Sequence, residues 1–222
     1  IAFAVFAAVP AVADDSDAVA VDSKTFLDDI DDGGYTVTGD IVVDLPAPAE
    51  GKSNALDILR NTKIDGTGTL TLNYEADAIQ QSLLNVKDGV TLTITGGVKV
   101  ILNMTAVYSI SENKSAGLHT IGDSYEAAGG TILIEKGSSL TVSQAEDAHG
   151  VSVAIAKIVV DNASFILDDA NGINAGTEFD VKNGSDISIT ADDRVAVFNI
   201  EGSVKDSEIK ATVSETATDK EK

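Results

Sequence analysis

A short phrase that recurs along the chain is the feature that most constrains its fold. VKDGVTLTIT at residues 86–95 returns as VKNGSDISIT at residues 181–190. Each copy has one aliphatic residue, a polar turn that favours Gly, Asn or Asp, and a short strand in which apolar and polar residues alternate. Related stretches occur elsewhere, and the aliphatic residues that begin them are Ile64, Val86, Ile134, Val160, Val181 and Val204.

The spacing of these residues predicts a solenoid. They follow one another after 22, 48, 26, 21 and 23 residues, and we interpret the longest interval as two periods, the second lengthened by a loop over residues 111–130. Short strands that recur in this way stack as rungs about 4.8 Å apart. The sequence therefore predicts an all-β parallel β-solenoid with about 22 residues per coil and about eight rungs, in which the six aliphatic residues form a ladder inside the coil.

The composition suits such a core, and the chain is long enough for one domain. Hydrophobic residues make up 43% of the 222 residues, but only 5% are aromatic and 19 are Gly, so the core must consist of small aliphatic side chains that close over tight turns. Before the strands, SKTFLDDIDDGG predicts a short capping helix that begins with Ser23 as N-cap and ends at Gly33–Gly34. We divide the chain into an N-terminal arm and acidic spacer (1–22), the solenoid (23–214) and a polar tail (215–222).

The short helix, followed by GYTVTGDIVV at residues 34–43 and TKIDGTGTLTL at residues 62–72, resembles the right-handed parallel β-helix proteins of the pectin-lyase-like type. The resemblance covers residues 23–214 and implies a right-handed coil. It also implies a secreted or cell-surface protein, which is either a polysaccharide-degrading enzyme or a non-enzymatic adhesin or surface-coat module. A β-sandwich is the alternative, but the two-residue Asn-Gly connections of regular hairpins are mostly missing.

The charge of the chain argues against several partners. It carries 36 acidic and 15 basic residues, which give a formal charge of −21, and only Arg60 and Arg194 offer a guanidinium. Such a field repels nucleic acid and polyanionic substrates. Solubility, or a salty and cation-rich habitat, is an alternative reason for the acidity. Because there is no Cys, disulfides and thiolate metal sites are excluded.

The first residues form an apolar run that is open to two interpretations. IAFAVFAAVPAVADD ends in Ala11-Val12-Ala13, which resembles a signal-peptide cleavage site and favours export, although a basic segment before it is missing. Thirteen residues are too few to span a bilayer, which needs about 20. If the run is retained, we predict an apolar arm that caps its own coil or adds to a neighbour's open edge. Its large apolar residues are Ile1, Phe3, Val5, Phe6 and Val9.

Candidate catalytic groups are few. The acidic pairs at 168–169 and 192–193 fall at similar phases of successive rungs, and Arg194 follows the second pair. A glycoside-cleaving site would use such carboxylates, but they are also expected as solvated corners of an acidic rod. His119 and His149 lie in different rungs without an acid that would orient them. No metal-binding motif is present, so we expect no cofactor. Because Arg is scarce, the histidines lack a partner and the charge opposes a polyuronate substrate, we also expect no enzymatic activity.

The chain contains four sequons for N-glycosylation, so modification of their Asn residues is one hypothesis. Asn is also a favoured turn residue, so the same pattern arises without modification. The acceptor residues are Asn103, Asn113, Asn162 and Asn183.

We therefore predict an exported, extracellular or cell-surface structural protein. Its subunits assemble with copies of themselves into a surface layer, sheath or filament, with cell-envelope glycans as possible further partners. The alternative is a carbohydrate-directed β-helix that serves as a binding module, an adhesin or a polysaccharide lyase or hydrolase. An adhesin would carry its binding face in the loop over residues 111–130.

Overall fold

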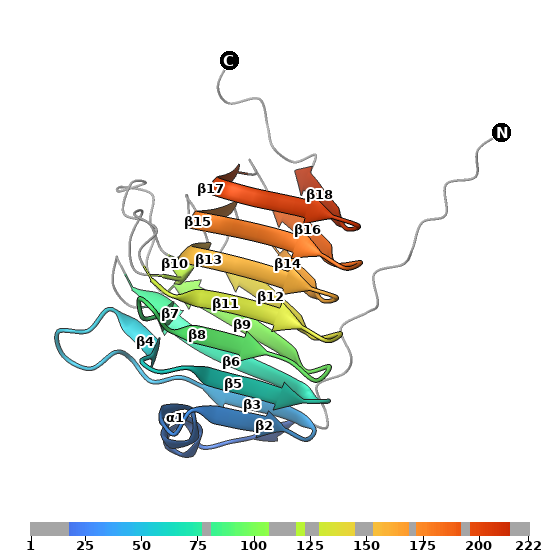
Figure 1. Cartoon of the computed structure of the whole chain (residues 1–222). Coiled ribbons are helices and arrows are strands. Elements are labelled where there is room, and N and C mark those ends of the chain that lie inside the picture. Colours follow the sequence, from blue (N-terminus) through green and yellow to red (C-terminus); the bar gives the residue numbers. More distant parts are fainter. Residues whose placement is uncertain are drawn as a thin grey trace.

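The computed structural model describes residues 18–76, 81–106, 119–122, 129–144, 153–168, 172–191 and 196–213. In these ranges the chain forms parallel strands and one helix, so the prediction of an all-β parallel fold is confirmed. Figure 1 shows the strands stacked along one direction, with the N-terminal elements at one end and the C-terminal elements at the other. The arrangement is compatible with a β-solenoid, in which each coil covers the apolar side chains of the next.

Each coil contributes strands to three faces, which we name A, B1 and B2. The A face contains β1 (Val19–Ala20), β3 (Asp40–Asp44), β6 (Thr69–Ala76), β9 (Lys99–Ala106), β12 (Ser139–Gln144), β14 (Ser164–Asp168), β16 (Asp186–Ala191) and β18 (Glu208–Val213). The B1 face begins with β2 (Gly34–Val37), β5 (Thr62–Gly66), β8 (Thr91–Ile94) and β11 (Thr131–Glu135). The B2 face begins with β4 (Asn54–Ile58), β7 (Ser82–Val86) and β10 (His119–Ile121).

The two B faces merge in the C-terminal coils. The merged strands are β13 (Val153–Asp161), β15 (Gly172–Lys182) and β17 (Ala196–Lys205). The first part of β13 pairs with β10 and its last part pairs with β11, so this one strand continues both faces. The register shifts at the bend, between Ile155 and Lys157 in the pairing of β13 with β15. Each coil thus passes through B2, B1 and A in that order.

An aliphatic ladder runs along the inside of the B1 face. Its members are the register partners Tyr35, Ile64, Ile94, Ile134, Val160, Val181 and Val204. The four residues from Ile94 to Val181 are completely buried. Apolar residues on the A face alternate in the same way, so that the inward side of every rung contributes to one continuous core.

The assignment of Val86 to this ladder was wrong. Val86 lies in β7 and pairs with Ile58 of β4, whereas Ile94 occupies the ladder position of that coil. The phrases at 86–95 and 181–190 are therefore alike in sequence but occupy different corners. VKDG joins B2 to B1, and VKNG joins B1 to A. The physical reason is that both corners need an inward aliphatic residue followed by a polar turn, so the pattern does not distinguish them.

The ladder also gives the lengths of the coils. Successive register partners are 29, 30, 40, 26, 21 and 23 residues apart. A spacing close to 22 therefore holds only for the last two steps. The earlier coils are longer because they carry additional chain between their strands, and the described residues contribute seven members to the ladder rather than the expected eight rungs.

The corner from B1 to A has a left-handed backbone in successive coils. The second residue after the ladder position has a positive φ in each of them: 57° at Lys136, 49° at Asn162, 59° at Asn183 and 51° at Asp206. Gly96 takes the same place with a φ of 83°. Asn, Asp and Gly tolerate this conformation better than other residues do, which explains the recurring composition of the turn.

The helix α1 (Ser23–Asp31) covers the N-terminal end of the core. Its N-cap is Asp22 rather than Ser23, and the Asp22 carboxylate accepts a hydrogen bond from the Thr25 N–H at 3.2 Å. Phe26 and Ile30 are buried, and the Phe26 ring meets Tyr35 edge-on with 5.0 Å between the ring centroids. This contact closes the first coil with apolar side chains.

Candidate functional site

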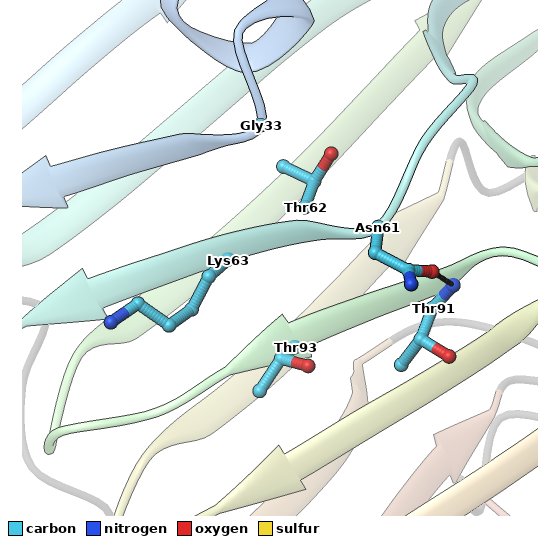
Figure 2. A pocket seen from close by; sticks show the side chains of 6 residues that line it. All are labelled: Gly33, Asn61, Thr62, Lys63, Thr91 and Thr93. Carbon is cyan, nitrogen blue, oxygen red and sulfur yellow. Dashed lines mark hydrogen bonds between the residues drawn. The ribbon is translucent and has the colours of Figure 1, made fainter.

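A pocket of about 230 Å³ lies on the B1 face, near the end that α1 covers. Figure 2 shows that its polar side chains come from the start of β5 and from β8 of the next coil. The residues that line it are Gly33, Asn61, Thr62, Lys63, Thr91 and Thr93. The pocket is shallow and open, and it exists because side chains of two adjacent coils surround the turn that follows α1.

Part of the polar lining is already used within the protein. Asn61 Oδ1 accepts a hydrogen bond from the Thr91 N–H at 2.9 Å, and the Thr62 hydroxyl donates to Arg60 O at 2.9 Å. The Thr93 hydroxyl has no such bond to the described residues and stays available to a ligand. A neutral, hydroxyl-rich molecule matches these groups best, since hydroxyls and amides both donate and accept. The lining contains no nucleophile paired with a general base.

Lys63 at the rim of the pocket belongs to a charged cluster that links the first two coils. Its ammonium lies 2.5 Å from the Asp65 carboxylate, which also accepts a hydrogen bond from the Thr36 hydroxyl at 2.8 Å. The pKa of Asp65 is held below its usual value mainly by the hydrogen bond from Lys63, and next by the hydrogen bond from Thr36. The ionised form of Asp65 is therefore stabilised by folding.

Asp65 is expected to add stability that depends on pH. Because its pKa is lowered in the folded chain, the contribution is complete above the unfolded value of about 3.9 and is lost as the pH falls through the lower folded value. We expect Asp65→Asn to reduce the free energy of unfolding by about 1 kcal/mol at pH 7 and by much less near pH 3. Urea unfolding of both proteins across this range measures the difference. Asp88→Asn, at an exposed turn, is the control, and an equal loss at every pH would contradict the assignment.

A second group of charged contacts links the C-terminal coils on the B1 face. Lys157 of β13 forms an ion pair with Glu178 of the adjacent strand β15, and the Ser203 hydroxyl donates to Asp180 at 2.8 Å. The pKa of Asp180 is lowered, first by its interaction with the Glu178 side chain and then by the Ser203 hydroxyl. These contacts tie neighbouring coils together. Within the described ranges, no group of three or more His, Asp or Glu side chains is arranged to hold a metal ion.

Three of the four sequons lie in described parts of the chain. Asn103 is on the A face, and its side-chain nitrogen donates to Asn73 Oδ1 at 3.1 Å. Asn162 and Asn183 are exposed at the left-handed corner of adjacent coils, and Asn183 Nδ2 donates to Asp161 Oδ1 at 2.6 Å. Asn113 lies outside the described residues. Asn162 and Asn183 therefore have exposed side chains at a corner, whereas Asn103 does not.

Most of the candidate catalytic residues fall outside the described part of the chain. Asp168 is exposed at the end of β14, and the backbone of His119 begins β10. The remaining candidates, Asp169, Asp192, Asp193, Arg194 and His149, lie outside the described residues, as do the arm residues Ile1, Phe3, Val5, Phe6 and Val9 and most of the loop over 111–130. Of the four candidate acids only Asp168 is described, so their grouping stays a prediction.

The two ends of the described coils differ. At the N-terminal end α1 covers the core, and Phe26 is completely buried. At the C-terminal end the ladder residue Val204 is 53% exposed and Ile209 of β18 is 38% exposed, whereas their register partners Val181 and Ile187 are buried. The last described coil therefore presents apolar side chains that earlier coils bury. Exposed inward residues beside an unpaired strand edge form a surface suited to binding.

A scan against protein-family models, a search of curated proteins and a search of solved structures each returned no significant match. The class of the protein is therefore defined by its own fold: in the described ranges it is an all-β chain of stacked parallel strands with one capping helix. Among the described residues there is no helix with the length and apolar character required to cross a bilayer.

Proposed function

We propose that this chain is a non-enzymatic structural subunit that is exported and assembles with copies of itself at a cell surface. The observation that carries the proposal is the asymmetry between a closed N-terminal end and a C-terminal end where Val204 and Ile209 are exposed. An open solenoid end is adhesive because its last rung has unpaired backbone groups above an apolar core. The Ala11-Val12-Ala13 signal supports export.

The finer features of the fold are part of the same proposal. We infer a right-handed coil, since connections between parallel strands of one sheet are right-handed in about 98% of cases. The minimal coil has about 22 residues, as the last two ladder steps indicate, and longer coils carry loops. The pectin-lyase-like resemblance supports this geometry.

Self-assembly predicts ordered particles in electron micrographs of the concentrated 222-residue chain. If the apolar run at 1–13 is retained after export rather than cleaved, it supplies a second contact in this proposal, since burying its Ile, Phe and Val side chains yields about 25 cal/mol per Å² before ordering costs. Removing residues 1–13 is therefore expected to leave the circular dichroism unchanged and to reduce the length of the assemblies. Particles that stay single at every concentration would contradict the proposed function.

The pocket favours carbohydrate binding as a second candidate function. Its Thr hydroxyls and the Asn61 amide suit a neutral sugar, and the charge of −21 opposes a polyuronate. Titration with neutral oligosaccharides distinguishes the two functions. Binding that is weakened by Thr93→Val, a change of similar size that removes the hydroxyl, would favour the carbohydrate function over assembly.

A further inference from the structure

The outer edge of β18 has unused backbone groups. The Glu208 N–H donates to Ser185 O at 3.1 Å, toward the preceding coil. Because amides alternate in direction along a parallel strand, those of Ile209 and Ala211 point away from β16. Within the described ranges no strand pairs with that side of β18. The edge thus offers a regular row of donors and acceptors to another strand.

The exposed apolar residues have a symmetric arrangement at this end. Val204 comes two residues before the corner Asp206-Ser207, and Ile209 comes two residues after it. They therefore lie on the B1 and A faces at equal distances along the chain from the corner. A two-fold axis that passes by both residues would set each of them against the same residue of a second copy, as in an isologous interface.

The charges on β18 complement themselves about that axis. Glu208 and Lys210 flank Ile209, both are exposed, and they lie 3.1 Å apart within one chain. In an antiparallel pair centred on Ile209, Glu208 faces Lys210 of the second copy and Lys210 faces Glu208. The amides of Ile209 and Ala211, which point to the open edge, then meet carbonyls of the second copy. Charge, backbone and apolar contacts are satisfied in one register.

Head-to-tail stacking fits this end less well. The N-terminal end presents α1 and the four-residue strand β2, whereas β17 at the other end has ten residues. In a head-to-tail contact, the N-terminal end of a second copy would therefore place a helix against half of β17. The C-terminal end of a second copy instead presents the same strands and the same exposed apolar residues.

We propose that the edge formed by β17 and β18 binds a second copy of this chain end to end, with β18 pairing antiparallel about Ile209. The inference rests on the proposed function and specifies its partner and contact surface. It yields a closed dimer as the smallest unit, so growth into longer assemblies uses a different contact. Each copy carries a formal charge of −21, so the dimer needs salt that screens the long-range repulsion.

Charge reversal on β18 tests the proposal. Sedimentation velocity of the full chain in about 0.15 M salt is expected to show a monomer–dimer equilibrium. Lys210→Glu sets carboxylates against each other at both cross-strand contacts and is expected to weaken the dimer about tenfold or more. The double variant Glu208→Lys with Lys210→Glu restores complementarity and is expected to recover wild-type affinity. Circular dichroism confirms that all three chains are folded.

Other results overturn the proposal and identify the true contact. A dimer that survives Lys210→Glu, or one that is lost when residues 1–13 are removed, would place the interface elsewhere while leaving self-assembly intact. Dimers that never grow into larger particles would support the interface and count against the proposed surface assembly. Hydrogen exchange of the Ile209 and Ala211 amides is expected to slow only at dimer-forming concentrations. Protection at concentrations where the chain is a monomer would show that the chain covers its own edge.

Discussion

Val181→Asp is expected to destabilise the chain by about 4 kcal/mol or more, enough to unfold much of a marginally stable domain. Val181 is completely buried in the ladder between Val160 and Val204. A carboxylate at this position would lose its water among aliphatic side chains and would gain no counter-ion. Urea unfolding at pH 7, followed by circular dichroism, measures the loss. Part of it should be recovered at pH values where the new side chain is protonated.

Val204→Asp is the matched control for this prediction. It makes the same chemical change one rung further along the same ladder, but Val204 is 53% exposed. A carboxylate there keeps most of its water, so we expect a loss of less than about 1 kcal/mol in the dilute monomer. Equal losses in the two variants would show that Val181 and Val204 do not share a ladder that ends at the last coil.

Gly68→Ala is expected to be the second most damaging change, at about 3 kcal/mol or more, although it adds a single methyl group. A Cβ at this position would lie 2.0 Å from Gly39 O of the preceding coil. The same oxygen accepts the hydrogen bond of the Thr69 N–H at 3.1 Å, so the methyl group can be accommodated only if the two coils separate at their corner. Thermal unfolding measures the loss as a lowered melting temperature.

Gly39→Ala provides the comparison, because Gly39 is at the same corner of the preceding coil. A Cβ at Gly39 meets no atom within 4 Å, and its φ lies outside the left-handed region. We expect this variant to be as stable as the wild type or slightly more stable, because Ala restricts the unfolded chain. A large loss in Gly39→Ala would mean that the corner does not tolerate any side chain, rather than that adjacent coils are in contact at Gly68.

Much of the core could be predicted from sequence because each rung repeats one local pattern. Ile134, Val160, Val181 and Val204 align at 26, 21 and 23 residues, and the structure pairs them in one register. The left-handed corner was visible in the same alignment, since Asn162 and Asn183 are residues that tolerate a positive φ.

Val86 shows where this reasoning failed. The B2-to-B1 corner and the B1-to-A corner impose the same demand on sequence, so a similar phrase at 86–95 and 181–190 did not reveal which corner each one forms. Only the pairing of Val86 with Ile58, and of Ile94 with Ile64, assigns them.

Serine at the corner after the B1 face was missed as well. Ser185 is buried, and its hydroxyl accepts a hydrogen bond from the Ala163 N–H at 3.2 Å, a role that the recurring Gly-Ser pairs at 137–138 and 184–185 could have suggested.

The candidate sites depended on contacts between coils and were less accessible to prediction. Asn61 and Thr91 are 30 residues apart, and no local pattern links the Asn61 side chain to the Thr91 amide that it binds. The self-complementary order Glu208-Ile209-Lys210 was present in the sequence, but it favours pairing with a second copy only where the strand edge is unpaired. That edge became apparent when the structure showed Val204 and Ile209 exposed.

The sequence by itself determined that this chain forms parallel strands around an aliphatic core, because alternation within a rung and a polar, Gly- or Asn-rich turn are local demands that every coil repeats. The tertiary structure alone decided the register: which residues stack, how long each coil is and which of the described coils exposes its apolar side chains. These properties depend on pairing between segments 21 to 40 residues apart, where similar rungs compete for the same partner and only packing of the whole stack selects one arrangement.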